Sequence, residues 1–191
     1  MTNMEPSASR SERISRLSIP ILAAAFLAGV AEGAVAYSLR SSKLERHVAG
    51  TNAITIHVVL ALAAAAVVIA VQARRTRKRG QAGPSPWTAP FSRSAVARLS
   101  RTARLSRGAA ALRLLPATPL ILLLLYCPYR MGAQVIGGLD PNSTVNAWGG
   151  PSYVGALLAH WLDCIVGCYV IAFLLGRLLA PATAGAQRQQ P

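Results

Sequence analysis

Four long stretches of the sequence carry almost no charge, and they constrain the fold more than any other feature. They cover residues 17–39, 53–72, 115–137 and 153–179. An α-helix rises about 1.5 Å per residue, so each stretch is long enough to cross a hydrocarbon layer roughly 30 Å thick. The pattern predicts an all-α fold: an integral membrane bundle of four transmembrane helices.

The composition favours one membrane domain over a soluble one. Of the 191 residues, 53% are hydrophobic, and the mean hydropathy is +0.40. Polar residues do not interrupt the apolar stretches with the 3.6-residue period that a soluble helical domain would show. We therefore predict a four-span membrane domain over residues 17–180, between a basic tail at 1–16 and a second tail at 181–191.

The distribution of basic residues predicts how the chain crosses the membrane. More than half of the 20 Lys and Arg residues fall in the loop at 73–113, whereas the loop at 138–152 has none. By the positive-inside rule, the basic loop and both tails are cytoplasmic and the uncharged loop is external. This topogenic signal accounts for the net charge of +14, so we predict no nucleic-acid binding. The expected location is the cell membrane, as a multi-pass protein of the bacterial inner membrane.

The first stretch has an alternative interpretation as a secretory signal peptide. Basic residues precede it, and the Ala-Val-Ala tripeptide at 34–36 fits an A-x-A cleavage site. The apolar run continues to Leu39, however, and Gly29 and Gly33 form a G-x-x-x-G pair, which allows close packing of membrane helices. We therefore predict a retained span, with cleavage as the alternative.

The second half of the basic loop, residues 92–113, predicts an amphipathic helix. Val96 and Leu99 fall on one helical face, with arginines largely on the others. These arginines are Arg98, Arg101, Arg104 and Arg107. We expect the helix to lie on the inner leaflet and its arginines to contact anionic lipid. Docking of an acidic protein partner is the alternative.

Five ionisable side chains inside the predicted spans are the candidate functional residues. They are Glu32, His57, Arg130, His160 and Asp163. A charged group at the centre of a span costs about 2.5–3.5 kcal/mol on insertion scales, so such residues are expected to face the bundle and to have partners. Under the predicted topology all five lie roughly 6–15 Å below the outer membrane surface.

Spacing and charge suggest how some of these residues pair. His160, Asp163 and Gly167 share one face of the fourth span because they are three and four residues apart. Gly167 leaves space on that face for a neighbouring helix. Arg130 is the one cation in the interior of a predicted span. Its guanidinium suits a carboxylate, so we expect it to pair with Glu32 or Asp163.

Three interpretations of this polar cluster remain open. It can fix the register of the helices, line a pocket for a ligand or proton, or perform acid–base catalysis. Cys127, Cys164 and Cys168 lie within apolar stretches, where cysteine usually behaves as a small hydrophobic residue. We expect no metal site and no cofactor.

The sequence contains no P-loop, H-E-x-x-H, C-x-x-C or G-x-S-x-G motif. The favoured function is a small membrane protein with a polar pocket in the outer half of the bundle. It would bind or help to move a small or lipidic ligand, as a homo-oligomer or beside a membrane-protein partner. One alternative is a membrane enzyme that uses Glu32 or Asp163 as a proton donor on an isoprenoid- or quinone-like substrate. Another is a structural or assembly protein.

Overall fold

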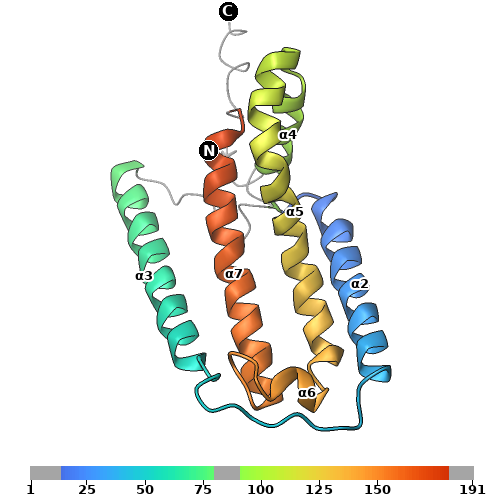
Figure 1. Ribbon diagram of the computed structural model, residues 1–191. Helices are drawn as coiled ribbons and strands as arrows, with labels where there is room; N and C mark the ends of the chain where they lie inside the picture. The colour runs from blue at the N-terminus through green and yellow to red at the C-terminus, as the bar shows by residue number, and fades with distance from the viewer. Residues whose placement is uncertain (1–13, 80–90, 181–191) are drawn as a thin grey trace, which may run out of the picture. The chain divides into compact units, whose positions relative to one another are not determined.

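The computed structural model describes residues 14–79 and 91–180, which are helical apart from their connecting loops and one isolated β-bridge between Ile14 and Ser92. The elements in chain order are α2 (Ser18–Ser38), α3 (Ile54–Arg79), α4 (Arg93–Ala103), α5 (Arg107–Gly137), α6 (Pro141–Thr144) and α7 (Tyr153–Leu178) (Figure 1). Parts of the predicted tails and of the basic loop, at 1–13, 80–90 and 181–191, lie outside the described residues.

Four of these helices, α2, α3, α5 and α7, are long and apolar enough to cross a membrane. This confirms the prediction of an all-helical chain with four such helices. Two of them are longer than predicted. Helix α3 continues to Arg79 because its final basic residues are good helix formers, and cations are favourable at a helix C-terminus. Helix α5 begins at Arg107 rather than at residue 115. At its start, the backbone N–H of Ala110 donates to the carbonyl of Ser106 at 2.8 Å.

The prediction of one helix over 92–113 is wrong in its second half. Ser92 caps α4, its Oγ accepting from the N–H of Ala95 at 3.3 Å, and the helix ends at Ala103. Residues 107–113 instead form the first turns of α5. The break follows Thr102, which is fully buried and whose hydroxyl accepts from the N–H of Ala180 at 2.9 Å. A contact with a distant segment therefore sets the end of α4.

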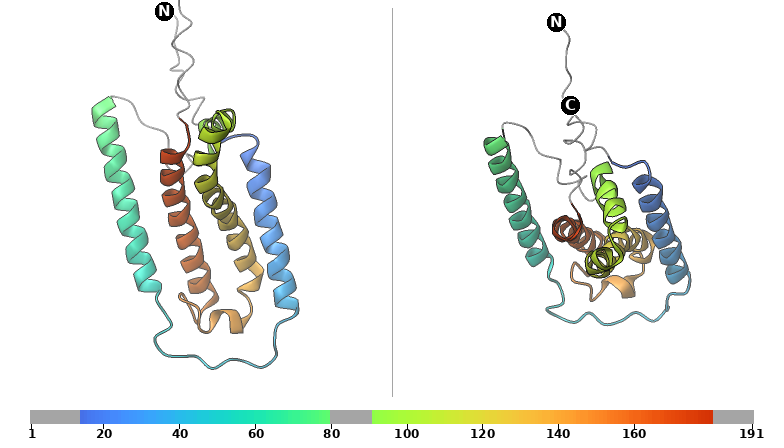
Figure 2. Two further views of the ribbon diagram at one scale, coloured as in Figure 1. Left: turned by 45° about the horizontal axis from the view of Figure 1, so that its top comes forward. Right: turned by 90° about the horizontal axis from the view of Figure 1, so that it is seen from above.

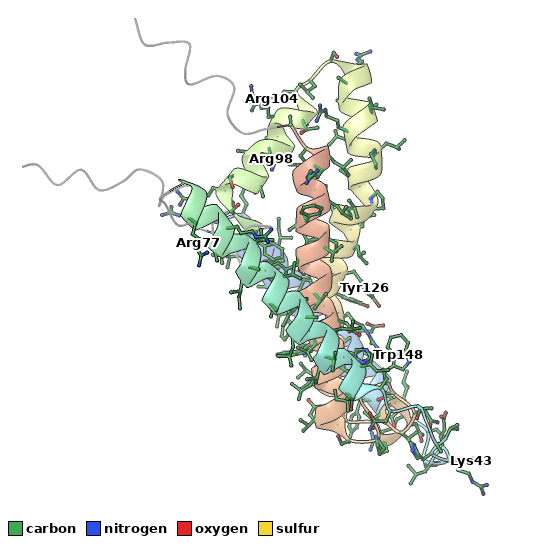
Figure 3. The ribbon with its side chains drawn as sticks, turned by 90° about the vertical axis from the view of Figure 1, so that its left-hand side faces the viewer. Lys43, Arg77, Arg98, Arg104, Tyr126 and Trp148 are labelled. Carbon is green, nitrogen blue, oxygen red and sulfur yellow. The ribbon has the colours of Figure 1, made fainter. Side chains whose placement is uncertain are left out.

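The described residues divide into two compact units, and α2, α5 and α7 contribute to both. In the first unit, which holds residues 14–19, 91–122 and 169–180, arginines cap the end of α7. The Arg98 guanidinium donates to the carbonyls of Gly176, Leu179 and Ala180 at 2.6, 3.0 and 3.2 Å. Figure 3 shows Arg98 beside the last turns of α7. The last carbonyls of a helix have no partners within it, so these bonds stabilise its C-terminus.

In the second unit, residues 20–79 and 123–168, α2 packs against α5 through glycines (Figures 1 and 2). A Cβ atom on Gly29 would overlap the carbonyl of Tyr129, and one on Gly132 would overlap the carbonyl of Phe26. Gly33 is buried in the same contact, one turn along α2. The two backbones therefore touch, which is the arrangement that small residues four apart allow.

Candidate functional site

At one end of the second unit, α6 and the loop at 39–52 lie beside the first turns of α3 and α7 (Figure 1). Asn142 and Asn146 hold this loop. Asn142 accepts from the backbone N–H of Glu45 at 2.8 Å and donates to the carbonyl of Lys43 at 3.0 Å. Asn146 accepts from the N–H of Val48 at 2.9 Å and donates to the carbonyl of residue 46 at 3.3 Å. Both side-chain amides are therefore already occupied by the loop.

Beneath this loop, His57 on α3 contacts Asp163 on α7. Imidazole Nε2 lies 3.3 Å from carboxylate Oδ2. The His57 side chain is 8% exposed, whereas that of Asp163 is 47% exposed. The pair thus joins a buried imidazole to a carboxylate with one accessible side. Sequence analysis named both residues but did not pair them.

The hydrogen bonds of His57 fix where its protons lie. Nδ1 is 2.9 Å from the carbonyl of Ala53, which can only accept, so Nδ1 carries a proton. Nε2 faces the Asp163 carboxylate, and a bare ring nitrogen and an ionised carboxylate would both be acceptors. A favourable contact needs a second proton, either on Nε2 or on the carboxyl group. The pair is therefore built to hold one exchangeable proton.

Trp148 covers the other side of His57. The two ring centroids lie 5.4 Å apart with an interplanar angle of 43°. The Trp148 carbonyl also accepts from the backbone N–H of Ala53 at 2.5 Å. Figure 3 shows Trp148 beside the first turns of α3, with Lys43 in the neighbouring loop and Arg77 toward the other end of the helix. Trp148 is 62% exposed, so most of its ring is accessible.

Arg130 on α5 does not pair with a carboxylate, which corrects the expectation from the sequence. Its Nη2 lies 3.4 Å from Nε2 of His160 on α7. In the described residues no ion pair joins Arg130 to Glu32 or Asp163. A guanidinium only donates hydrogen bonds, so Nε2 of His160 accepts and the proton of the neutral ring lies on Nδ1. The rotation of α5 and α7 about their axes, which a residue's position along the sequence does not give, therefore places Arg130 beside His160.

Glu32 lies apart from the other four predicted site residues. It is exposed on α2, and its carboxylate lies near the Tyr129 hydroxyl of α5. The structure therefore brings together His57, Arg130, His160 and Asp163 and leaves Glu32 outside the cluster.

An open cleft of about 420 Å³ lies next to the His57–Asp163 pair. We call it the loop-side cleft, and it is lined by Asn142, Ser143, Asn146, Ala147, Trp148, His160 and Asp163. Asp163 is the only charged side chain among these lining residues. Because the two asparagine amides bind the loop, Asp163, His160 and the Trp148 ring are the groups best placed to contact a ligand.

Other predicted residues have packing contacts. A Cβ atom on Gly167 would lie 3.9 Å from the Cys127 sulfur, so this glycine faces α5. The three cysteines are free thiols, and Cys127 of α5 lies near Cys164 and Cys168 of α7. Across residues 14–79 and 91–180, no group of three or more His, Cys, Asp or Glu side chains is arranged to hold a metal ion.

The arginines predicted to contact lipid differ in their surroundings. Arg98 is engaged with the end of α7, whereas Arg104 and Arg107 are exposed. Arg101 is partly exposed and lies one helical turn from Arg98.

Trp148, Asn142 and Asn146 were not among the site residues predicted from the sequence. Trp148 precedes the fourth apolar stretch, near the end of a predicted span, where tryptophan is common. The two asparagines were hidden among ordinary turn-forming residues. Asn142 and Asn146 are four residues apart and follow Asp140, which caps α6. This spacing was the one signal in the sequence that the two side chains would point to the same side of the chain. Comparisons of the chain with protein-family models, curated proteins and solved structures found no match.

Proposed function

We propose that this chain is a multi-pass protein of the bacterial inner membrane that binds a small ligand in the loop-side cleft and exchanges a proton as it does so. The single observation that carries the proposal is the His57–Asp163 pair, 3.3 Å apart and bordering the cleft. The Asp163 side chain is 47% exposed and lines the cleft, so a ligand in the cleft can reach its carboxylate while His57 contacts it from α3.

The membrane orientation belongs to the same proposal. Residues 73–113 face the cytoplasm because of their basic charge, so the loop at 138–152 and the cleft open to the outside. Arg101, Arg104 and Arg107 then meet anionic lipid of the inner leaflet. In the apolar part of α3, Ile54–Val71, 6% of the residues are buried. The exposed apolar surface of α3 supports contact with lipid, and with a second copy of the chain or a membrane-protein partner.

Ligand binding can be tested by a thermal-shift screen of water-soluble small molecules on the purified full-length protein. A compound present at 100 times its Kd adds about 2.7 kcal/mol to the free energy of unfolding. We expect at least one compound to raise the melting temperature of the wild type but not of Asp163→Asn. The asparagine can donate to Nε2 of a neutral His57, so the variant removes the charge without leaving an unpaired histidine.

Glu45→Gln is the matched control. It also removes one carboxylate at this end of the second unit, but the exposed Glu45 side chain does not line the cleft. It should retain the response to the same compound. A screen in which no compound stabilises the wild type, or in which every active compound stabilises Asp163→Asn equally, would refute the proposed site.

A further inference from the structure

We propose that the ligand of the loop-side cleft is a small organic cation, of the protonated-amine class, and that it displaces the proton of the His57–Asp163 pair. The inference rests on the proposed function and adds the ligand's charge and the direction of proton movement. Three features support it: the charge of the cleft, its aromatic wall, and the proton balance of the pair.

The charge of the cleft favours a cation. Asp163 is the one charged residue among the seven that line it, and its carboxylate is accessible. Arg130 does not line the cleft, and its Nη2 lies 3.4 Å from Nε2 of His160. Lys43 and Arg46, whose backbone carbonyls accept from Asn142 and Asn146, are exposed and do not line the cleft either. The exposed ring of Trp148 lies in the same lining, and the face of an indole ring attracts cations. An anion would meet the carboxylate and the negative face of this ring.

The volume limits the size of the ligand. At about 420 Å³ the cleft lies near the small end of the range for ligand sites, which runs from about 300 to 1,000 Å³. Because it is open to solvent, a ligand can place its charged group near Asp163 while the remainder stays outside.

The hydrogen bonds of the pair determine what leaves when the cation enters. Nδ1 of His57 keeps its proton on the carbonyl of Ala53. An ammonium group that donates an N–H to the Asp163 carboxylate replaces the second proton, which departs to water from Nε2 of His57. One positive charge enters and one leaves. The site thus exchanges R–NH₃⁺ for H⁺ without changing its net charge.

The other charged and titratable groups around the pair favour this exchange over simple addition. Arg130 on α5 supplies one fixed positive charge, and His160 on α7 is held neutral as its acceptor. Cys164, the residue after Asp163, is a buried thiol. A second cation beside the protonated pair would therefore meet two positive groups, Arg130 and His57. Competition between proton and amine is the expected result.

Three probes of one shape can test the ligand class: phenethylamine, 2-phenylethanol and phenylacetate, which are cationic, neutral and anionic near neutral pH. The chain contains three tryptophans. A Trp87→Phe/Trp161→Phe variant leaves Trp148 as the only reporter, so its fluorescence follows occupancy of the cleft. We expect phenethylamine to bind at least about tenfold more tightly than the other two probes. Binding should be lost in Asp163→Asn and retained in Glu45→Gln, each made in the same background.

Proton release provides a readout that needs no variant. In weakly buffered solution with a pH-sensitive dye, phenethylamine should release up to one proton per site. Because the proton and the amine compete for the pair, Kd should rise as the pH falls, by up to about tenfold per pH unit.

The outcomes separate the two proposals. Tighter binding of phenylacetate or 2-phenylethanol, with loss in Asp163→Asn, would overturn the cationic ligand and leave the proposed site standing. Amine binding without proton release, or with a pH-independent Kd, would overturn the exchange. If none of the three probes binds, the inference fails, while the compound screen on Asp163→Asn still decides the proposed function.

Discussion

Nε2 of His57 and Oδ2 of Asp163 lie 3.3 Å apart, and this contact joins α3 to α7. It connects a residue near the start of one helix with a residue in the third turn of another. The partner of each group is therefore set by tertiary structure, and the stability of the pair can be measured directly.

A double-mutant cycle should show that the two residues are coupled. His57→Gln and Asp163→Asn should each lower the melting temperature in detergent, because each replaces the imidazole–carboxylate contact with a weaker neutral one. The stability lost by the double variant should be smaller than the sum of the losses in the two single variants, with a coupling free energy of at least about 0.5 kcal/mol. The half-exposed carboxylate argues against values as large as those of fully buried ion pairs. His57→Gln combined with Glu45→Gln is the control and should be additive.

The sequence was sufficient to predict the four long helices, because long apolar runs without charge have few other stable forms. From position along each helix it also predicted similar depths for Glu32, His57, Arg130, His160 and Asp163; the structure brings the last four together, and Glu32 lies apart from them. It could not give their pairing. Contact between helices depends on how each is rotated about its axis and on which helices are neighbours. In the structure Asp163 contacts His57 of α3, and Arg130 contacts His160 of α7.

The end of the amphipathic helix shows the same limit. Nothing in residues 92–113 stops a helix locally, so a continuous one was predicted. The break after Ala103 coincides with the burial of Thr102 against Ala180, which is 78 residues away in sequence. Contacts of this range leave no periodic signal in the sequence.

Gly29→Ala should destabilise the protein strongly. The new methyl group would overlap the Tyr129 carbonyl, so α2 must move away from α5. Overpacking of this kind costs about 1–3 kcal/mol. Gly108→Ala is the matched control, because a Cβ atom there meets nothing within 4 Å. Melting temperatures that fall equally in both variants would argue against backbone contact between α2 and α5.

Arg98→Met should weaken the end of α7. The guanidinium donates to three carbonyls there, and hydrogen bonds from charged groups contribute about 1.5–3 kcal/mol. Hydrogen–deuterium exchange should become faster for the amides at 175–180. Arg104→Met removes the same charge from an exposed position and should leave that exchange unchanged. Equal protection in wild type and Arg98→Met would show that the cap contributes nothing to order.

The orientation of the chain can be tested with reporter fusions. A reporter that is active only outside the cytoplasm should be active when inserted in the loop at 138–152. It should be inactive when fused near Gly80, because the surrounding basic residues retain that loop in the cytoplasm. The reversed pattern would place the loop-side cleft on the cytoplasmic side. The ligand would then enter from the cytoplasm.

Arg130 should couple to His160 and not to Glu32. Arg130→Met removes the donor to Nε2 of His160. Its effect on the melting temperature should therefore differ between the wild-type background and a His160→Gln background. The coupling should be at least about 0.5 kcal/mol. Arg130→Met and Glu32→Gln should instead be additive, since in the described residues no ion pair joins Arg130 to Glu32. Recovery of stability in the Arg130→Met/Glu32→Gln double variant would reinstate the arginine–carboxylate pair that the sequence suggested. Additivity with Glu32 together with coupling to His160 would show that Arg130 contacts His160, one of the residues that line the loop-side cleft, and not Glu32.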